Sequence, residues 1–174
     1  PGDAVIVSGD LGRHGIAIMS VREGLQFEGG PDSDCGSLAE MVAAMLDAGT
    51  EVHCLRDLTR GGLAAALNEI AVGAGVGIQL LEDSIPVSEP VAGACELLGL
   101  DPLYVANEGR LVAFVPAEAA ESVLEIIRSH PSGRQAAVVG TVSKAHAGTV
   151  ELRGPLGGGR ILDLLSGEQM PRIC

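Results

Sequence analysis

The chain ends on a cysteine, Cys174, and a thiol in this position can do chemistry that an internal thiol cannot. Residues 166–170 are mostly polar, and residues 165–174 are expected to form a flexible tail. A thiol on such a tail can visit several sites in turn, carrying a covalently attached group between them. The ending is not a prenylation signal, because that signal places its cysteine fourth from the end. The alternative is a terminal cysteine without a function.

A second candidate segment lies where a strand is expected to give way to a helix, at residues 57–62. The amide groups and the dipole at the start of a helix favour a negatively charged ligand. Two glycines would let a phosphate approach the backbone, and an arginine adds a fork of donors. The alternative is that Asp57 or Thr59 caps the helix and the glycines relieve crowding. The candidate phosphate-binding residues are Asp57, Thr59, Arg60, Gly61 and Gly62.

A carboxylate before another expected strand, Glu108, is a candidate general base. It stands in the sequence Asn107-Glu108-Gly109-Arg110. The alternative is a solvated glutamate in a turn. Asn107 is a further possible site residue. His14 is a candidate for a hydrogen bond to a substrate, although a single histidine in a glycine-rich turn (residues 9–15) more often has a structural role.

The elements that must position these residues alternate between strands and helices. Apolar runs predict strands over 4–8, 52–55, 77–81, 111–115, 135–142 and 149–153, and helical periodicity predicts helices before Gly24 and over 63–71, 91–98 and 117–129. The spacing of Ser37 and Glu40 is that of a capping box, followed by an apolar helical face that includes Leu46 and by a stop at Gly49. The pattern indicates a layered α/β (α+β) sandwich with a mixed sheet.

Composition excludes several classes of function. The net charge of −12 disfavours nucleic acid and anionic membranes, since phosphate binding needs clustered Lys and Arg. No apolar run approaches the roughly 18–20 residues of a membrane span, and no signal-peptide layout is present. Aromatic residues make up only 2% of the chain, so the core must be aliphatic. The chain begins at Pro1 without a Met, which indicates a truncated chain or an excised domain, with a processed start as the alternative.

The remaining cysteines match no zinc or redox spacing, and no metal site is predicted. We expect Cys35, Cys54 and Cys95 to behave as small, partly buried hydrophobic residues. Four cysteines could form two disulfides, but nothing indicates secretion, and intracellular thiols are normally reduced. We therefore expect a cytoplasmic protein.

Together these segments resemble the HypE family, the carbamoyl dehydratases of NiFe-hydrogenase maturation. The resemblance covers essentially the whole chain but only the C-terminal half of the family's pattern; its N-terminal ATP-binding domain is absent. It implies a C-terminal α/β domain at residues 1–164, of the type found in aminoimidazole ribonucleotide synthetase relatives, and a tail at 165–174. The segments that carry it are residues 9–18, 52–69, 95–109 and the ending Gly-Glu-Gln-Met-Pro-Arg-Ile-Cys at 167–174.

The resemblance also implies a mechanism. The partner HypF would transfer a carbamoyl group to Cys174, ATP would phosphorylate the carboxamide oxygen, and loss of phosphate would leave a thiocyanate. The HypC–HypD complex would accept the cyanide for iron. Glu108 matches the family's candidate base, and residues 57–62 match its loop near the nucleotide phosphates.

ATP and Mg²⁺ would be bound mainly by the N-terminal half, the full-length protein would be a homodimer, and this part alone would be inactive. Family members often have Gly-Asp-His-Gly where this chain has Arg13 before His14, which leaves the role of that turn open. Two other interpretations stay open: another ATP-dependent member of the superfamily, and a non-catalytic interaction or carrier domain.

Overall fold

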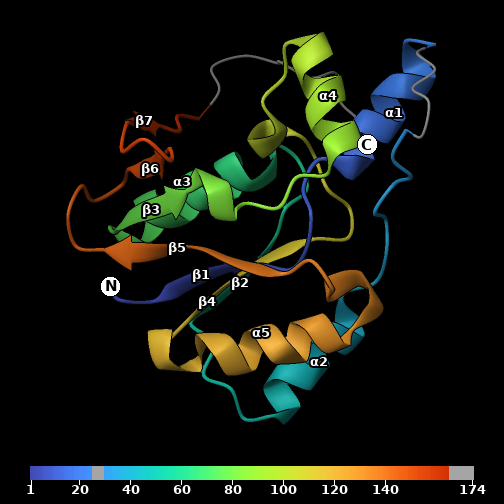
Figure 1. Cartoon of the computed structure of the whole chain (residues 1–174). Coiled ribbons are helices and arrows are strands. Elements are labelled where there is room, and N and C mark those ends of the chain that lie inside the picture. The colour runs from blue at the N-terminus through green and yellow to red at the C-terminus, as the bar shows by residue number, and fades with distance from the viewer. Residues whose placement is uncertain (25–29, 165–174) are drawn as a thin grey trace.

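A seven-stranded sheet runs through the molecule (Figure 1), which we describe from a computed structural model over residues 1–24 and 30–164. The strand order is β2-β4-β1-β5-β3-β6-β7. The pairing of β3 with β6 is parallel and the other neighbours are antiparallel, so the predicted mixed sheet is confirmed. The strands are β1 (Ala4–Val7), β2 (Cys54–Asp57), β3 (Gly77–Leu81), β4 (Leu111–Val115), β5 (Ala137–Ser143), β6 (Val150–Arg153) and β7 (Gly159–Ile161).

Strand β1 lies near the middle of the sheet and is apolar at every position because helices cover both of its faces. Successive side chains of a strand point to opposite faces. Val5 and Val7 therefore join a cluster with helix α3 (Gly62–Ala74). Ala4 and Ile6 join a second cluster with α2 (Ala39–Asp47) and α5 (Ala120–Ser129), which lie together below the sheet in Figure 1.

Two further helices, α1 (Arg13–Arg22) and α4 (Glu89–Leu98), pack side by side at one end of the molecule (Figure 1). They share a small cluster in which Ile16 contacts the buried side of α4, including Cys95. Short 3-10 helices connect the main elements among the described residues: Glu82–Ser84, Pro102–Tyr104, Ala117–Ala119 and Pro131–Gly133.

Two of the predicted boundaries were clearly wrong, and one strand was not predicted. The second strand begins two residues later than predicted because Cys54 pairs with Phe114 and the ladder continues to Asp57. Helix α1 begins at Arg13, inside the predicted glycine-rich turn, so that turn ends at Gly12. Strand β7 was not predicted, since all three of its residues are exposed and it carries no apolar alternation.

The predicted capping box is also wrong. Helix α2 has Leu38 at its N-cap, and the Ser37 hydroxyl accepts a hydrogen bond from the Ala39 amide at 3.2 Å. Leu46, predicted to face inward, is 56% exposed, because the helix buries only the side that carries Met41 and Met45. The predicted stop at Gly49 is confirmed by its left-handed backbone, with φ at +70°.

No helix in the described part of the chain is long and apolar enough to cross a membrane.

Candidate active site

The side chain of Asn107 joins three segments that are far apart in sequence. Its Oδ1 accepts a hydrogen bond from the Gly12 amide at 2.7 Å. Its Nδ2 donates to the carbonyl oxygens of Leu58 at 3.0 Å and Val105 at 3.1 Å. The side chain is fully buried, so it cannot reach a ligand without a rearrangement. Its contacts give this possible site residue a positioning role.

The turn that carries Glu108 is held by a residue that the sequence analysis missed, Asp34. Its carboxylate accepts hydrogen bonds from the amides of Glu108 and Gly109, each at 3.3 Å. A side chain on Gly109 would overlap the Asp34 carbonyl oxygen, so only glycine allows this loop to pass over the turn. Glu108 itself is partly buried. Long-range hydrogen bonds fix the backbone of the turn, and a general base must be held in a fixed position to reach the proton that it accepts.

A buried ion pair forms the floor beneath this turn. The Arg110 Nη2 atom lies 2.5 Å from Asp10 Oδ1, and both side chains are about 95% buried, with exposures of 5% and 4%. Arg110 Nε also donates to the Asp10 carbonyl oxygen at 2.8 Å. A Cβ on Gly9 would lie 2.8 Å from that Nε atom, so glycine makes room for the guanidinium. Buried charges are tolerated when they are paired and hydrogen-bonded, as here.

His14 lies in the first turn of α1 and its Nδ1 is 2.9 Å from the Ser33 hydroxyl. The same turn is tied to the site by the Gly15 amide, which donates to the carbonyl oxygen of Ala106 at 3.0 Å. His14 therefore connects α1 to the loop that carries Asp34. This arrangement supports the structural interpretation of the histidine.

The segment predicted to bind phosphate lies directly against the Asn107 turn. The Leu58 amide donates to the Arg110 carbonyl oxygen, and the Leu58 carbonyl accepts from the Asn107 amide, both at 3.0 Å. Asp57 ends strand β2, is exposed, and lies 3.4 Å from Arg56 Nε. Helix α3 has Gly61 at its N-cap and no side-chain cap from the described residues, so neither Asp57 nor Thr59 caps it.

Both glycines of this segment are required by the fold. Gly61 has φ at +76°, and a Cβ there would lie 2.5 Å from Ala65 Cβ. A Cβ on Gly62 would lie 2.6 Å from the carbonyl oxygens of Leu103 and Val105. The alternative interpretation, that the two glycines relieve crowding, is therefore confirmed for both. Phosphate binding by this segment is compatible with that explanation. Arg60 is exposed beside the start of α3 and forms no ion pair with the described residues.

The cysteines differ in their surroundings. Burial, with a smaller contribution from Asp101, raises the pKa of the Cys95 thiol to about 11. Burial also raises the pKa of Cys54, which is half-buried. Both fit the expectation of small hydrophobic residues, whereas Cys35 is exposed, so that expectation was wrong for it. Cys174 lies outside the described residues.

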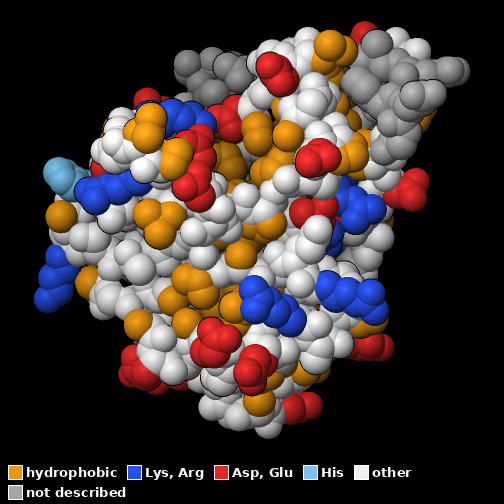
Figure 2. Space-filling view, in the orientation of Figure 1, with side chains coloured by type: hydrophobic (Ala, Val, Ile, Leu, Met, Phe, Trp, Pro, Cys, Tyr) orange, Lys and Arg blue, Asp and Glu red, His pale blue; other side chains and the backbone are white. Residues whose placement is uncertain are grey.

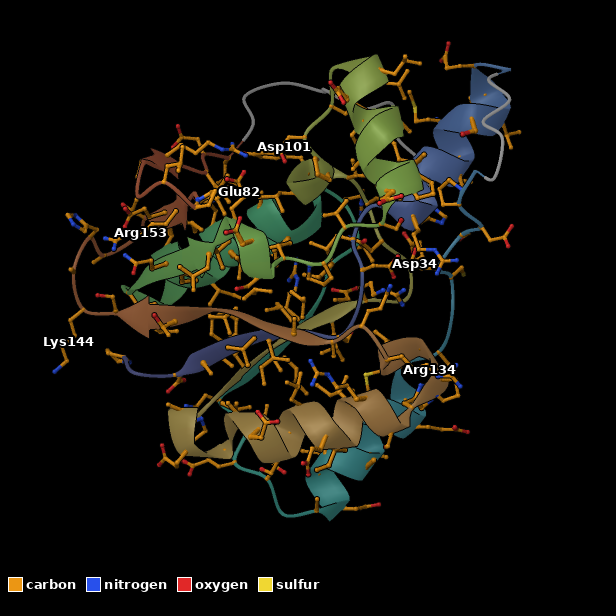
Figure 3. The ribbon with its side chains drawn as sticks, in the orientation of Figure 1. Asp34, Glu82, Asp101, Arg134, Lys144 and Arg153 are labelled. Carbon is orange, nitrogen blue, oxygen red and sulfur yellow. The ribbon has the colours of Figure 1, made fainter. Side chains whose placement is uncertain are left out.

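Hydrogen bonds connect the Asn107–Glu108 turn to Leu58 and to the start of α1, at one edge of the molecule. Figure 3 shows Asp34 at this edge of the molecule, beside the base of α1. No group of three His, Cys, Asp or Glu side chains in the described ranges is placed to hold a metal ion. The arrangement offers a carboxylate on a rigid turn next to a helix N-terminus.

The chain is similar to known proteins along most of its length. Residues 1–153 match the family model described as AIR synthase related protein, C-terminal domain. The chain is 58% identical over 174 residues to a protein of Azotobacter vinelandii named carbamoyl dehydratase HypE, covering 100% of this chain and 51% of that protein. The chain therefore spans about half the length of the curated relatives that it matches.

Solved structures show the same relationship. A structure described as hydrogenase maturation protein HypE in complex with ATP superposes with a TM-score of 0.94 at 46% identity, covering 100% of this chain and 53% of that one. A HypE–HypF complex gives a TM-score of 0.89 at 42% identity, with 94% of this chain and 53% of that chain covered. The chain belongs to the family of AIR synthase related proteins, C-terminal domain, and within that family it is a relative of the HypE hydrogenase maturation proteins.

Proposed function

We propose that this chain is part of a longer enzyme that converts an S-carbamoyl group on Cys174 into a thiocyanate with the use of ATP. In the reaction, the carboxamide oxygen attacks the γ-phosphorus of ATP and ADP leaves. The carbon–oxygen bond then breaks, phosphate leaves with the oxygen, and the nitrogen loses both of its protons. The balance is one S-carbamoyl group and one ATP consumed, with one thiocyanate, ADP, phosphate and a proton formed. The cyanide would then serve as an iron ligand in a hydrogenase.

The names of the relatives support this reaction class. The Azotobacter vinelandii relative is named a carbamoyl dehydratase, and a similar solved chain was determined with ATP. Another was determined as a complex with HypF, which we propose as the carbamoyl donor to Cys174. A HypC–HypD complex as cyanide acceptor, a homodimeric full-length protein and a cytoplasmic location complete the proposal.

The observation that carries the catalytic assignment is the clamp on the Glu108 turn. The Asp34 carboxylate accepts hydrogen bonds from the amides of Glu108 and Gly109. The residue before Glu108, Asn107, accepts a hydrogen bond from the Gly12 amide through its side chain. Two independent contacts therefore fix the backbone that presents the Glu108 carboxylate. In our proposal this carboxylate accepts a proton from the carboxamide nitrogen as the carbon–nitrogen triple bond forms.

The described residues could contribute one side of an ATP site. Arg60 and the N-terminus of α3 offer a guanidinium and helix amides to a phosphate. In this proposal ATP and Mg²⁺ are bound mainly by the rest of the longer protein, and residues 1–174 alone are inactive.

The decisive experiment is Glu108→Gln in the full-length protein, incubated with HypF, carbamoyl phosphate and ATP. Glutamine keeps the size of the side chain but cannot accept a proton at neutral pH. Carbamoylation of Cys174 should proceed, while conversion to the nitrile should slow by about 10²–10⁴-fold, the usual cost of losing a general base. Mass spectrometry of the C-terminal peptide separates the two forms.

Two controls accompany this variant. Glu96→Gln removes an exposed glutamate on α4 and should convert at the normal rate. Cys174→Ala should accept no carbamoyl group. Nitrile formation by Glu108→Gln at the normal rate would remove Glu108 from the chemistry. Carbamoylation of another cysteine in Cys174→Ala would overturn the carrier assignment, and carbamoylation without any nitrile in the unaltered protein would favour a non-catalytic carrier domain.

A further inference from the structure

The loop that carries Asp34, residues 30–37, contains no helix or strand, and side chains hold most of it in place. Among the described residues, a single backbone–backbone hydrogen bond joins this Asp34 loop to the rest of the chain, from the Gly36 amide to the Glu108 carbonyl oxygen at 3.4 Å. The Asp34 side chain is fully buried and accepts the amides of Glu108 and Gly109. The position of the loop therefore bears directly on the backbone that presents the Glu108 carboxylate.

The first turn of helix α1 holds this loop immediately before Asp34. His14 Nδ1 lies 2.9 Å from the Ser33 hydroxyl oxygen. The same hydroxyl oxygen accepts a hydrogen bond from the Cys35 amide at 3.1 Å, so it joins the two residues that flank Asp34. His14 therefore contacts the side chain that shapes the backbone on both sides of the Asp34 carboxylate.

The first turn of α1 also contacts the Glu108 turn directly. The Gly12 amide donates to Asn107 Oδ1 at 2.7 Å, and the Gly15 amide donates to the Ala106 carbonyl oxygen at 3.0 Å. Together these hydrogen bonds close a ring that runs from α1 through the Asp34 loop to the Glu108 turn and back to α1. The contact of the histidine with the loop is the only side-chain to side-chain contact printed by this ring's hydrogen bonds among the described residues.

We infer that His14 is a positioning residue for Glu108, acting through Ser33 and the Asp34 loop. The inference rests on the proposed role of Glu108 as a general base, which must be held within hydrogen-bond reach of the proton that it accepts. Without the imidazole the ring is open at one contact, and the Asp34 carboxylate can then move away from the two amides that it accepts.

The contact between His14 and Ser33 is exposed to solvent, which limits the size of the effect. Figure 2 shows Lys or Arg and Asp or Glu side chains together at the surface near the base of α1. A second contact also holds the loop, since Arg13 Nε donates to the Asp32 carbonyl oxygen at 3.1 Å, and it remains when His14 is changed. The loss of one neutral hydrogen bond corresponds to a change of about 2- to 10-fold in an equilibrium constant.

The first measurement needs no catalysis. Hydrogen exchange of the full-length protein, read by mass spectrometry on the peptide of residues 106–111, reports the two amides that Asp34 accepts. His14→Ala and Ser33→Ala should each speed their exchange by about 2- to 10-fold. Alanine is a stronger helix former than histidine, so His14→Ala does not weaken α1 itself. His14→Asn should retain the slow exchange, because asparagine also carries a polar atom bonded to Cγ, as histidine does with Nδ1.

The second measurement is nitrile formation in full-length protein that HypF has already carbamoylated. A displaced base lowers the maximum rate at saturating ATP and leaves the ATP concentration for half of that rate unchanged. His14→Ala and Ser33→Ala should each lower the maximum rate by about 2- to 10-fold, and the double variant no further, because both changes remove the same contact. In the Glu108→Gln background, His14→Ala should have no added effect, since no base is left to position.

The matched control is His53→Ala, which also removes an exposed, hydrogen-bonded histidine. His53 contacts Asp3, which precedes β1, whereas the site lies beyond the other end of that strand. It should change neither measurement.

Unchanged exchange in His14→Ala would overturn the inference, and so would faster exchange with a normal rate of nitrile formation. An equal loss of rate in the Glu108→Gln background would show that His14 acts by another route, which also overturns it. A normal rate in Glu108→Gln alone rejects the proposed base together with the inference. A slow Glu108→Gln variant beside a normal His14→Ala variant rejects the inference and leaves the proposed function standing.

Discussion

Replacing Asn107 with alanine removes one carboxamide group, and it should destabilise the domain more than the loss of an ordinary buried carboxamide. The change removes the acceptor of the Gly12 amide, a buried donor that has no other acceptor among the described residues. Leaving such a group unsatisfied costs about 1–3 kcal/mol. The carbonyl oxygen of Val105 loses a donor, worth about 0.5–1.5 kcal/mol, whereas that of Leu58 keeps the Asn107 backbone amide. We expect a loss of about 2–4 kcal/mol in the free energy of unfolding.

Asn68 is the matched control because it is also a buried asparagine whose Nδ2 donates to two carbonyl oxygens. These belong to Ala64 at 2.9 Å and Leu162 at 2.8 Å. No backbone amide in the described ranges donates to its Oδ1, so Asn68→Ala leaves no orphaned N–H group. Its cost should be about 1–2 kcal/mol.

Urea unfolding of residues 1–174, followed by circular dichroism, measures both variants against the unaltered chain. The slopes of free energy against urea should agree, so that the midpoints report stability alone. An Asn107→Ala variant that loses no more stability than Asn68→Ala would refute the reasoning. That result would mean that the Gly12 amide finds another acceptor, such as a water molecule, once the side chain is removed.

Two further predictions concern titratable groups. Hydrogen bonds to Asp3, at 2.6 Å, and to Glu51 raise the pKa of His53, so its contribution to stability is full below about pH 6.5 and is lost as the pH rises through the higher folded value. Urea midpoints of the unaltered chain should fall over that window relative to His53→Gln, and parallel curves for the two proteins would contradict the prediction. In iodoacetamide labelling at pH 8, read by mass spectrometry, exposed Cys35 should react rapidly. Cys95 should react slowly because a pKa of about 11 leaves about one thiol in a thousand ionised; equal rates would contradict this.

The sequence was a good guide to the fold wherever periodicity and burial coincide. Strand β1 is apolar throughout and central, and α5 buries the predicted Val123, Leu124 and Ile127. The sequence predicted the edge of the sheet poorly. All three residues of strand β7 are exposed and the strand lies at one edge of the sheet, so it forms by backbone pairing with β6, which no hydrophobic pattern predicts.

The candidate site shows the same division between local and long-range information. Local sequence placed Glu108 and residues 57–62 next to expected strands and made them candidates, and they remain candidates. It could not assign the burial of Asn107, whose hydrogen bond to the Gly12 amide spans 95 positions of the chain. Nor could it select Asp34, which lies 74 positions from the Glu108 amide that it holds.

Gly109 could have pointed to the contact with Asp34. A glycine directly after a candidate base has two explanations: conformational freedom, or the close approach of another segment. Gly109 does not need a positive φ, so freedom is not the reason, and the overlap that a Cβ would make with the Asp34 carbonyl shows that close approach is. The same test separates Gly61, which has a positive φ, from Gly9, which makes room for Arg110. Much of the glycine in this site therefore records tertiary contacts, and each such position constrains where the loops around Glu108 can lie.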